Sequence, residues 1–157
     1  MTSEHDWTED LRGLHVLVVD DNTDARTIFK AILTYEGASV LVAPSGVGAA
    51  KILKHIRPSV VLTDLSMPRH DGLWLIRWIR NRDAKKPGTH LPVIAVSARD
   101  DVYLEATTLA SGFDEYLVKP VEPHELFAAI RRVARHSFRP YRLEQLAGGL
   151  PERGHDP

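Results

Sequence analysis

The segment VVLTDLSMPRHDGL, residues 60–73, places a carboxylate at the point where an apolar run ends. Residues 60–62 have the composition of a buried strand, and Asp64 follows almost directly. The chain is then expected to turn at Met67-Pro68 and again at Asp71-Gly72, because proline and glycine interrupt regular structure. Acids are common at strand ends, so this position alone leaves two interpretations open: a solvated loop residue or a reactive group.

The rest of the chain repeats this organisation, with short apolar runs followed by segments of helical period. Near-continuous apolar strands that alternate with helices indicate an α/β fold, with a parallel sheet whose strands are buried on both faces. The sequence predicts strands at 16–19, 39–43, 60–64, 92–97 and 115–118, and helices at 22–36, 45–55, 72–82, 100–111 and 122–135.

Length and composition bound the class of protein. The chain has 157 residues, of which 43% are hydrophobic and 26% charged, as in an ordinary soluble domain. A net charge of −1 lacks the basic excess that would indicate binding to nucleic acid or to an anionic membrane. There is no cysteine, which excludes a disulfide scaffold, a thiol nucleophile and a cysteine-based zinc site. No signal peptide or spanning segment is evident, so a cytoplasmic protein without membrane insertion is expected.

The two ends differ from the body of the chain. Residues 1–11 are acidic and show little period, which predicts a flexible extension. Residues 12–136 are expected to form the folded domain. Residues 137–157 are rich in proline and glycine and are expected to form a largely flexible tail.

Polar residues follow four of the five predicted strands. The first strand ends in Asp20-Asp21, the third in Asp64, the fourth in Ser97 and the fifth in Lys119. Because ligands bind beyond the carboxyl ends of parallel strands, these side chains are expected to converge. Clustered carboxylates suit Mg²⁺, and a carboxylate beside a metal can attack phosphorus. The alternative is that each is an ordinary solvated loop residue.

With these residues in place, the chain resembles the response-regulator receiver domain of two-component signalling. The stretches that carry the resemblance are VLVVDDN (16–22), VVLTDLSMPRHDGL (60–73), PVIAVSA (92–98) and GFDEYLVKPVEPHEL (112–126). Together these stretches are distributed over residues 14–135. The resemblance implies a doubly wound (βα)5, flavodoxin-like fold with strand order 2-1-3-4-5.

The resemblance also implies roles for the acidic residues. Asp64 corresponds to the phosphoacceptor. Asp21 and Asp64 correspond to direct ligands of Mg²⁺ or Mn²⁺, with Asp20 acting through water. The backbone carbonyl of Ser66 corresponds to a further metal ligand.

Other positions are implied to contact the phosphoryl group. The Ser97 hydroxyl and the Lys119 ammonium correspond to its side-chain partners. The backbone groups of Leu65 and Ala98 correspond to its main-chain partners.

Further positions are implied to tune the site or report its state. Tyr116 corresponds to an aromatic residue that changes rotamer together with Ser97. Ser66 and Arg99 occupy positions that set the hydrolysis rate. The Lys119-Pro120 bond is expected to be cis.

The implied function is a phosphorylation-activated switch rather than an enzyme with external substrates. A sensor histidine kinase or a histidine phosphotransfer protein would donate the phosphoryl group. The change would alter the face built by the fourth helix, fifth strand and fifth helix, and so control a protein partner or pass the phosphate on. A homodimer through this face is a further expectation, with arginines of the last helix opposite Asp114 and Glu115.

Several alternatives stay open at this point. The chain is expected to be a stand-alone receiver, or else a receiver fragment of a hybrid kinase or multidomain regulator. A phosphohydrolase is disfavoured, because such enzymes usually carry a second acid two residues after the nucleophile, where Ser66 stands. Trp74 and Trp78 share one flank of a predicted helix, which indicates either partial burial or a partner-binding patch.

Overall fold

The computed structural model describes residues 10–67, 71–98 and 102–137. Most of the predicted N-terminal extension and of the predicted tail lies outside these ranges, so their boundaries stay predictions. Arg99 also lies outside them. Within the described ranges, no helix combines the length and the apolar composition that crossing a membrane requires.

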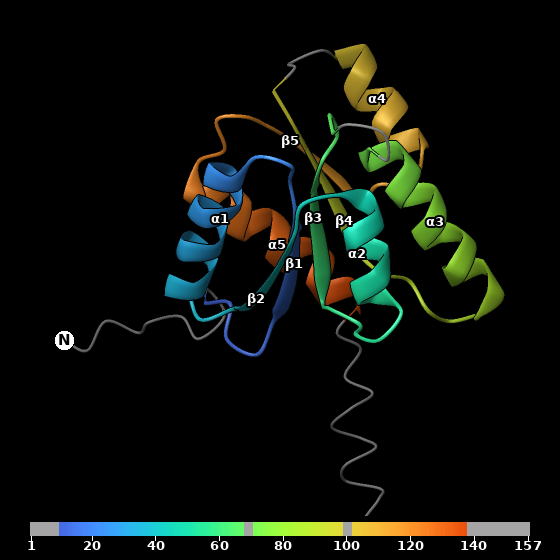
Figure 1. The fold of residues 1–157 in the computed structure, drawn as a ribbon, viewed down its shortest axis with the longest axis horizontal. Coiled ribbons are helices and arrows are strands. Elements are labelled where there is room, and N and C mark those ends of the chain that lie inside the picture. The colour runs from blue at the N-terminus through green and yellow to red at the C-terminus, as the bar shows by residue number, and fades with distance from the viewer. Residues whose placement is uncertain (1–9, 68–70, 99–101, 138–157) are drawn as a thin grey trace, which may run out of the picture.

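The fold is a five-stranded parallel sheet with strand order β2-β1-β3-β4-β5, as the resemblance predicts (Figure 1). Every strand is followed by a helix. The strands are β1 (His15–Val19), β2 (Ser39–Ala43), β3 (Val60–Asp64), β4 (Val93–Ser97) and β5 (Glu115–Val118). The helices are α1 (Thr23–Tyr35), α2 (Gly46–Leu53), α3 (Gly72–Lys85), α4 (Val102–Ala110) and α5 (Pro123–Ser137).

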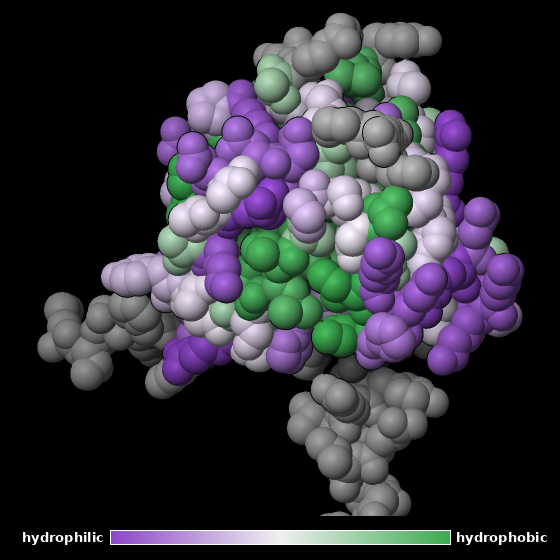
Figure 2. Space-filling view, viewed as in Figure 1, coloured by the Kyte–Doolittle hydropathy of each residue, from purple (hydrophilic) through white to green (hydrophobic). Residues whose placement is uncertain are grey.

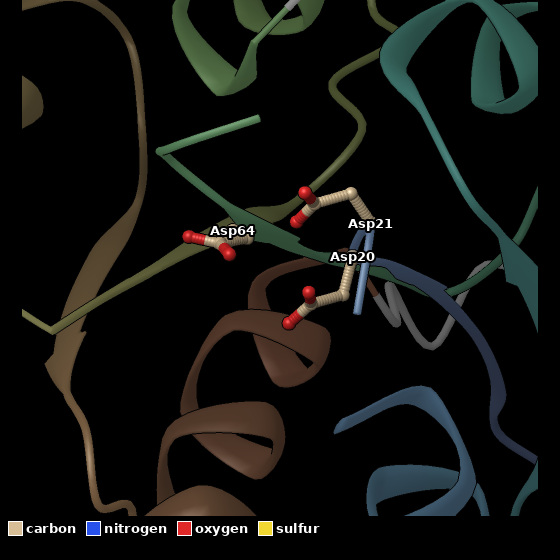
Figure 3. Close-up of side chains that lie close together, drawn as sticks. All are labelled: Asp20, Asp21 and Asp64. Carbon is tan, nitrogen blue, oxygen red and sulfur yellow. The ribbon is translucent and has the colours of Figure 1, made fainter. Parts of the chain in front are cut away.

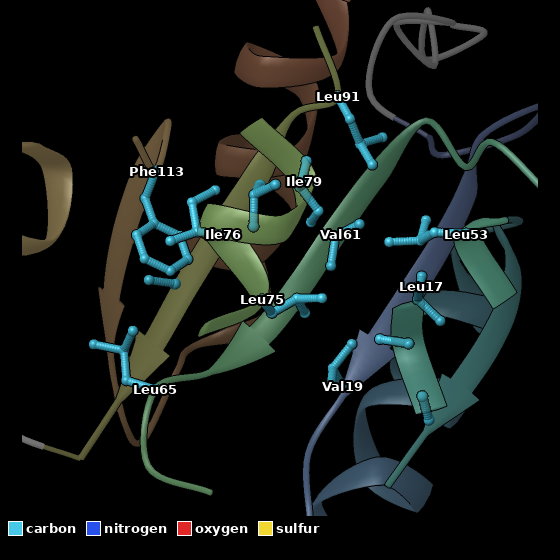
Figure 4. Close-up of a cluster of buried hydrophobic side chains, with 14 of the residues drawn as sticks. Leu17, Val19, Leu53, Val61, Leu65, Leu75, Ile76, Ile79, Leu91 and Phe113 are labelled. Atoms are coloured by element: carbon cyan, nitrogen blue, oxygen red, sulfur yellow. The ribbon is translucent and has the colours of Figure 1, made fainter. Parts of the chain in front are cut away.

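The sheet separates two hydrophobic clusters, because successive strand residues point to opposite faces. Leu17 and Val61 face α2 and α3, where they pack with buried residues of α3 (Figure 4). Val16 and Val18 face the other side, where Leu33 of α1 and several residues of α5 close the second cluster. This two-sided burial fixes the register, since a slip of one residue would exchange the two clusters.

The edge strand β2 departs from the expectation of two-sided burial. Leu41 is 43% exposed and Val42 is 36% exposed, whereas the apolar residues of β1, β3 and β4 are buried from Val16 onward. Ile28 of α1 fits the helical period of apolar residues but is 57% exposed. Sequence periodicity identifies apolar positions, but strand order determines which of them other elements cover.

Trp74 and Trp78 are partly buried against the cluster beneath α2 and α3, which favours partial burial over a free patch. The Arg82 guanidinium lies 4.9 Å from the centre of the Trp78 ring and donates to the carbonyl of Leu53 at 2.6 Å. This contact joins the last turn of α3 to the end of α2. The helix continues to Lys85, three residues beyond the predicted end, so the loop before β4 is shorter than expected.

A network of charged residues lies at the amino ends of β4 and β5. Arg80 donates to Asp83 Oδ2 at 2.8 Å and to Asp114 Oδ2 at 2.9 Å. Its other bonds go to the backbone carbonyls of Gly112, at 2.9 Å, and Leu91, at 2.7 Å. Arg80, Asp83 and Asp114, named here the amino-edge network, thus tie α3 to the segments that enter both strands.

Candidate functional site

Three carboxylates meet at the carboxyl ends of β1 and β3 (Figure 3). Asp20, Asp21 and Asp64 each offer an oxygen, and these oxygens lie within 4.8 Å of one another. Asp20 is buried, Asp64 is half-buried and Asp21 is exposed. The adjacency of β1 and β3 creates the cluster, since residues 20 and 64 are far apart in the sequence.

Hydrogen bonds at the start of α1 hold Asp20 in place. The backbone N–H of Asn22 donates to Asp20 Oδ1 at 2.9 Å, and the Asn22 side chain accepts from the N–H of Ala25 as the helix N-cap. Arg26 donates to the backbone carbonyl of Asp20 at 2.6 Å. The acidic turn is therefore fixed by the first helical turn rather than held loosely in solvent.

A lysine joins the acids from the end of β5. Lys119 Nζ lies 3.1 Å from Asp20 Oδ2 and 3.4 Å from Asp64 Oδ2. Its own backbone N–H donates to the carbonyl of Ser97 at 2.8 Å, and the Lys119-Pro120 peptide bond is cis. The other oxygen of Asp64 accepts from the N–H of Ser66 at 3.1 Å. Two of the three carboxylates, Asp20 and Asp64, thus share one ammonium group.

Burial shifts the titration of both charged partners. It raises the pKa of Asp64, against the opposing effects of the Ser66 N–H and the Lys119 charge, while the nearby Asp20 charge raises it further. Burial alone would lower the pKa of Lys119. The hydrogen bond to Asp20 and the charges of Asp64 and Asp20 outweigh it, so the pKa of Lys119 is raised. The folded state therefore stabilises the charged form of Lys119, whereas Lys119 and the Ser66 N–H offset only part of the cost of burying the Asp64 charge.

The turn after Asp64 requires glycine. Asp71 caps α3 by accepting from the N–H of Trp74 at 2.9 Å, and Gly72 donates to the carbonyl of Leu65 at 3.2 Å. A Cβ at Gly72 would lie 2.6 Å from the carbonyl oxygen of Asp64, closer than van der Waals contact allows. The first residue of α3 thus presses directly against the backbone of Asp64.

The predicted switch residues occupy β4, which neighbours β3, and the edge strand β5. Ser97 ends β4 and is 2% exposed, and it lies opposite Val118 in the register with β5. Tyr116 lies in β5, partly buried against the cluster beneath α2 and α3. Both positions therefore adjoin the carboxyl edge where Lys119 enters the site.

The predicted main-chain contacts have different surroundings. The N–H of Leu65 donates to the carbonyl of Val96 at 3.1 Å, so the sheet already uses it. The N–H of Ser66 instead points at the Asp64 carboxylate. Ser66 and Ala98 are both exposed at the rim of the site.

The donor set fits a hard divalent cation. Carboxylate and carbonyl oxygens are the ligands that Mg²⁺ takes, usually together with several waters. Three acids with a single lysine leave negative charge that such an ion would neutralise. Asp20, Asp21 and Asp64 are the residues that would hold it, with the carbonyl of Ser66 a predicted further ligand.

Comparison with known proteins agrees with this geometry. The family model of the response regulator receiver domain matches residues 16–131. The chain belongs to the response regulator receiver family. The match includes Asp20, Asp21, Asp64, Ser97 and Lys119, so the family assignment and the acidic cluster rest on the same part of the chain.

Relatives of this receiver differ in length. It is 36% identical to the response regulator MprA of Mycobacterium sp. (strain KMS) over 124 residues, 79% of this chain and 52% of the relative. The chain therefore spans about half the length of the MprA relatives it matches. It is 38% identical to an uncharacterized 14.6 kDa protein of Leptolyngbya boryana over 122 residues, 78% of this chain and 91% of that protein.

Solved receiver structures share the fold. The Francisella response regulator 1452 receiver domain is 28% identical, with a TM-score of 0.72 over 79% of this chain and 98% of that one. A response regulator receiver domain protein from Clostridium thermocellum is also 28% identical, with a TM-score of 0.71 over 79% of this chain and 96% of that one.

Sequence reasoning missed two residues that shape the site. Arg26 fits the helical pattern as an ordinary polar residue, and nothing local in the sequence indicates its bond to Asp20. Gly72 was read as a turn residue, whereas its close approach to Asp64 explains why a side chain is excluded there. Both contacts depend on how a helix start packs against a strand end.

Proposed function

We propose that this receiver is a phosphorylation-activated signalling switch in which Asp64 accepts a phosphoryl group. The observation that carries the proposal is the half-buried Asp64 carboxylate, flanked by Asp20 and Asp21 and within 3.4 Å of Lys119. One nucleophilic oxygen, an acidic cluster for a cation and an ammonium group are the parts that phosphoryl transfer requires.

The donor is a phosphohistidine on a sensor histidine kinase or a histidine phosphotransfer protein. An Asp64 oxygen attacks phosphorus, the phosphorus–nitrogen bond breaks, and the leaving imidazole takes up a proton. Mg²⁺ or Mn²⁺ held by Asp20, Asp21, Asp64 and the Ser66 carbonyl supplies charge neutralisation to this transfer. Lys119 stabilises the charge on the transferred group, and the Ser66 N–H adds a donor beside it.

The phosphorylated state differs from the starting state by about two negative charges and three acceptor oxygens. Ser97 and the backbone of Ala98 gain a new acceptor at the end of β4. Movement of Ser97 frees space into which Tyr116 turns, and the face of α4, β5 and α5 shifts its population toward an active form. Hydrolysis of the acyl phosphate, at a rate set in part by Ser66 and Arg99, restores the starting state.

The altered face binds a downstream protein partner, or the phosphoryl group passes to another histidine. A homodimer through this face is a second use of the same surface. Arg132 donates to both Glu115 oxygens, at 2.6 and 2.9 Å, and Asp114 belongs to the amino-edge network. Glu115 and Asp114 already have arginine partners within the chain. A dimer would therefore either leave these pairs intact or replace them with pairs between the two copies.

The test is treatment with acetyl phosphate and Mg²⁺, followed by intact mass. A single phosphate adduct is expected, and Asp64→Asn should abolish it. Asp24→Asn, which removes an exposed carboxylate at the start of α1, should label as the wild type does.

Two results would contradict the proposal. Adduct formation that persists in Asp64→Asn would move the acceptor elsewhere. Repeated hydrolysis of a small phosphoester, with many product molecules per chain, would indicate a phosphohydrolase rather than a switch that turns over only its own phosphate.

A further inference from the structure

The near-neutral total charge of the chain conceals a basic region on α2 and α3. In the described part of residues 46–86, no acidic residue is exposed: Asp64 belongs to the site, Asp71 caps α3 and Asp83 pairs with Arg80. The exposed cations of the same region are Lys51, Lys54, Arg57, Arg77, Arg82, Lys85 and Lys86. Such segregation creates a local positive potential that total charge does not reveal.

An apolar patch adjoins this basic region. Leu41 of β2 lies opposite Leu17 in the register, on the α2 side of the sheet, and is 43% exposed. Ile52 of α2 is partly buried, and Ile56 just after α2 is 47% exposed. Figure 2 shows apolar residues gathered over β2 and α2, with hydrophilic residues flanking them on the α2–α3 side.

We call this patch, together with the cations around it, the β2–α2 surface. It comprises three apolar residues and three basic ones: Leu41, Ile52, Ile56, Lys51, Lys54 and Arg57. A surface of this kind fits an acidic segment that carries an apolar anchor, because burial of the anchor and charge attraction then act together.

The chain itself contains such a segment. Residues 1–9, MTSEHDWTE, carry three acids, Glu4, Asp6 and Glu9, around a single large aromatic residue, Trp7. They lie outside the described ranges. A tryptophan offers a large apolar area with few rotatable bonds, which suits an anchor.

The segment joins the fold at Leu11, which packs in the cluster on the α1–α5 side of the sheet, just before β1. Leu11 is buried and donates its N–H to the carbonyl of Glu36 at 2.9 Å. Four residues later, His15 exchanges hydrogen bonds of 2.9 and 2.7 Å with Ser59, which lies two residues after Arg57. Nine extended residues reach about 30 Å, whereas the eight residues of α2 span about 12 Å. The segment is long enough to cross the whole surface.

We propose that residues 1–9 cover the β2–α2 surface of their own chain. Trp7 packs on Leu41, Ile52 and Ile56, and the acids lie beside the surrounding cations. The covalent tether gives the segment an effective concentration of about a millimolar, so individually weak exposed ion pairs suffice. Any acidic partner of α2 must then displace the segment, which makes it a built-in competitor that acts independently of Asp64.

The test compares methyl NMR spectra of the full chain with those of a variant lacking residues 2–9 and of Trp7→Ala. The Ile52 and Ile56 methyl signals should move in both variants, because they lose the ring current of Trp7. Ile28, which is exposed on α1, is the internal control and should not move. Salt at about 1 M should reduce the difference between full chain and deletion, since the Debye length falls to about 3 Å.

Four outcomes would overturn the proposal. Ile52 and Ile56 signals that are the same in the full chain and the deletion variant would leave the surface uncovered by this segment. Movement of Ile28 to the same extent would indicate a general change of fold. Shifts that grow with protein concentration would assign the occupant to a second copy, and a response only to added poly-glutamate would assign it to an acidic partner.

Discussion

Two charged clusters lie at opposite edges of the same sheet, and they are built on different principles. At the amino edge, Arg80 satisfies Asp83, Asp114 and two backbone carbonyls. At the carboxyl edge, Asp20, Asp21 and Asp64 cluster, and Lys119 contacts two of them, Asp20 and Asp64. In the first cluster one guanidinium bonds both carboxylates, whereas in the second the single ammonium contacts two of three carboxylates, so the second carries the larger excess of negative charge.

The difference shows how to separate a structural cluster from a functional one. A buried charge that has all its hydrogen bonds within the protein stabilises the fold and needs no ligand. A cluster of like charges that the protein leaves uncompensated costs stability, which a bound cation or a phosphoryl group can offset.

Arg80→Ala should destabilise the fold most. Removal of the guanidinium takes one donor each from Asp83, Asp114 and two backbone carbonyls, and breaking such partly buried pairs together costs about 3 kcal/mol. Asp83 keeps the N–H of Leu91, and Asp114 keeps the N–H of Val93 and the His90 ring. Urea unfolding should show the loss as a lower midpoint with an unchanged slope. Arg77→Ala, at an exposed position of the same helix, should change stability by less than about 0.5 kcal/mol. Equal effects of the two substitutions would contradict a special role for the amino-edge network.

Gly72→Ala should affect both stability and the site. The new Cβ would lie 2.6 Å from the Asp64 carbonyl, so α3 must shift, at a cost of about 2 kcal/mol. Acetyl phosphate labelling of Asp64 should slow as well, because the turn that presents the carboxylate moves. Gly48→Ala is the matched control, since its nearest neighbour is the Ser45 hydroxyl at 3.3 Å and alanine favours helix. A labelling rate equal to that of the wild type would argue against this coupling.

Mg²⁺ should stabilise the carboxyl edge. At ten times its dissociation constant, a ligand of the folded state adds about 1.4 kcal/mol, measurable as a rise in thermal midpoint. Asp21→Asn should remove most of this gain, whereas Asp24→Asn should retain it. A gain of equal size in Asp21→Asn would place the cation outside the acidic cluster.

Asp64→Asn should stabilise the metal-free protein by about 1 kcal/mol. Burial raises the pKa of Asp64, which means that the folded state disfavours its charge, and the amide removes that charge. The advantage should shrink as the pH falls through the raised pKa of Asp64 and toward the ordinary range of aspartate, because the wild-type carboxyl then takes up a proton and its penalty disappears. Thermal unfolding in EDTA across this pH range measures the difference in stability between Asp64→Asn and the wild type. A variant less stable than the wild type at neutral pH would show that the contact with Lys119 outweighs burial.

Local patterns predicted much of the fold. Apolar runs located all five strands, and Asn22 and Ser45 cap α1 and α2 as their residue types favour. The acids after two of these runs were predicted to converge, and the structure brings Asp20, Asp21 and Asp64 together. These features depend on neighbours in sequence and on the general rule for parallel sheets, so a single sequence suffices.

Features set by non-local contacts escaped prediction. The exposure of Leu41 follows from the edge position of β2, and three of the four partners of Arg80 come from segments 11 to 34 residues away. The close approach of Gly72 to Asp64 depends on where α3 packs, which no local pattern specifies. Arg26 is similar, since its periodicity is that of any exposed helical residue.

The sequence by itself therefore determined the elements, their order and the residue types at the strand ends, because hydrophobic period and capping act over a few residues. The tertiary structure decided the charge relations. It placed Asp20 and Asp64 around Lys119, beside Asp21, at one edge and gave Arg80 a full set of acceptors at the other. Electrostatic compensation depends on distance and burial, and the chain acquires both only when strands far apart in sequence become neighbours in the sheet.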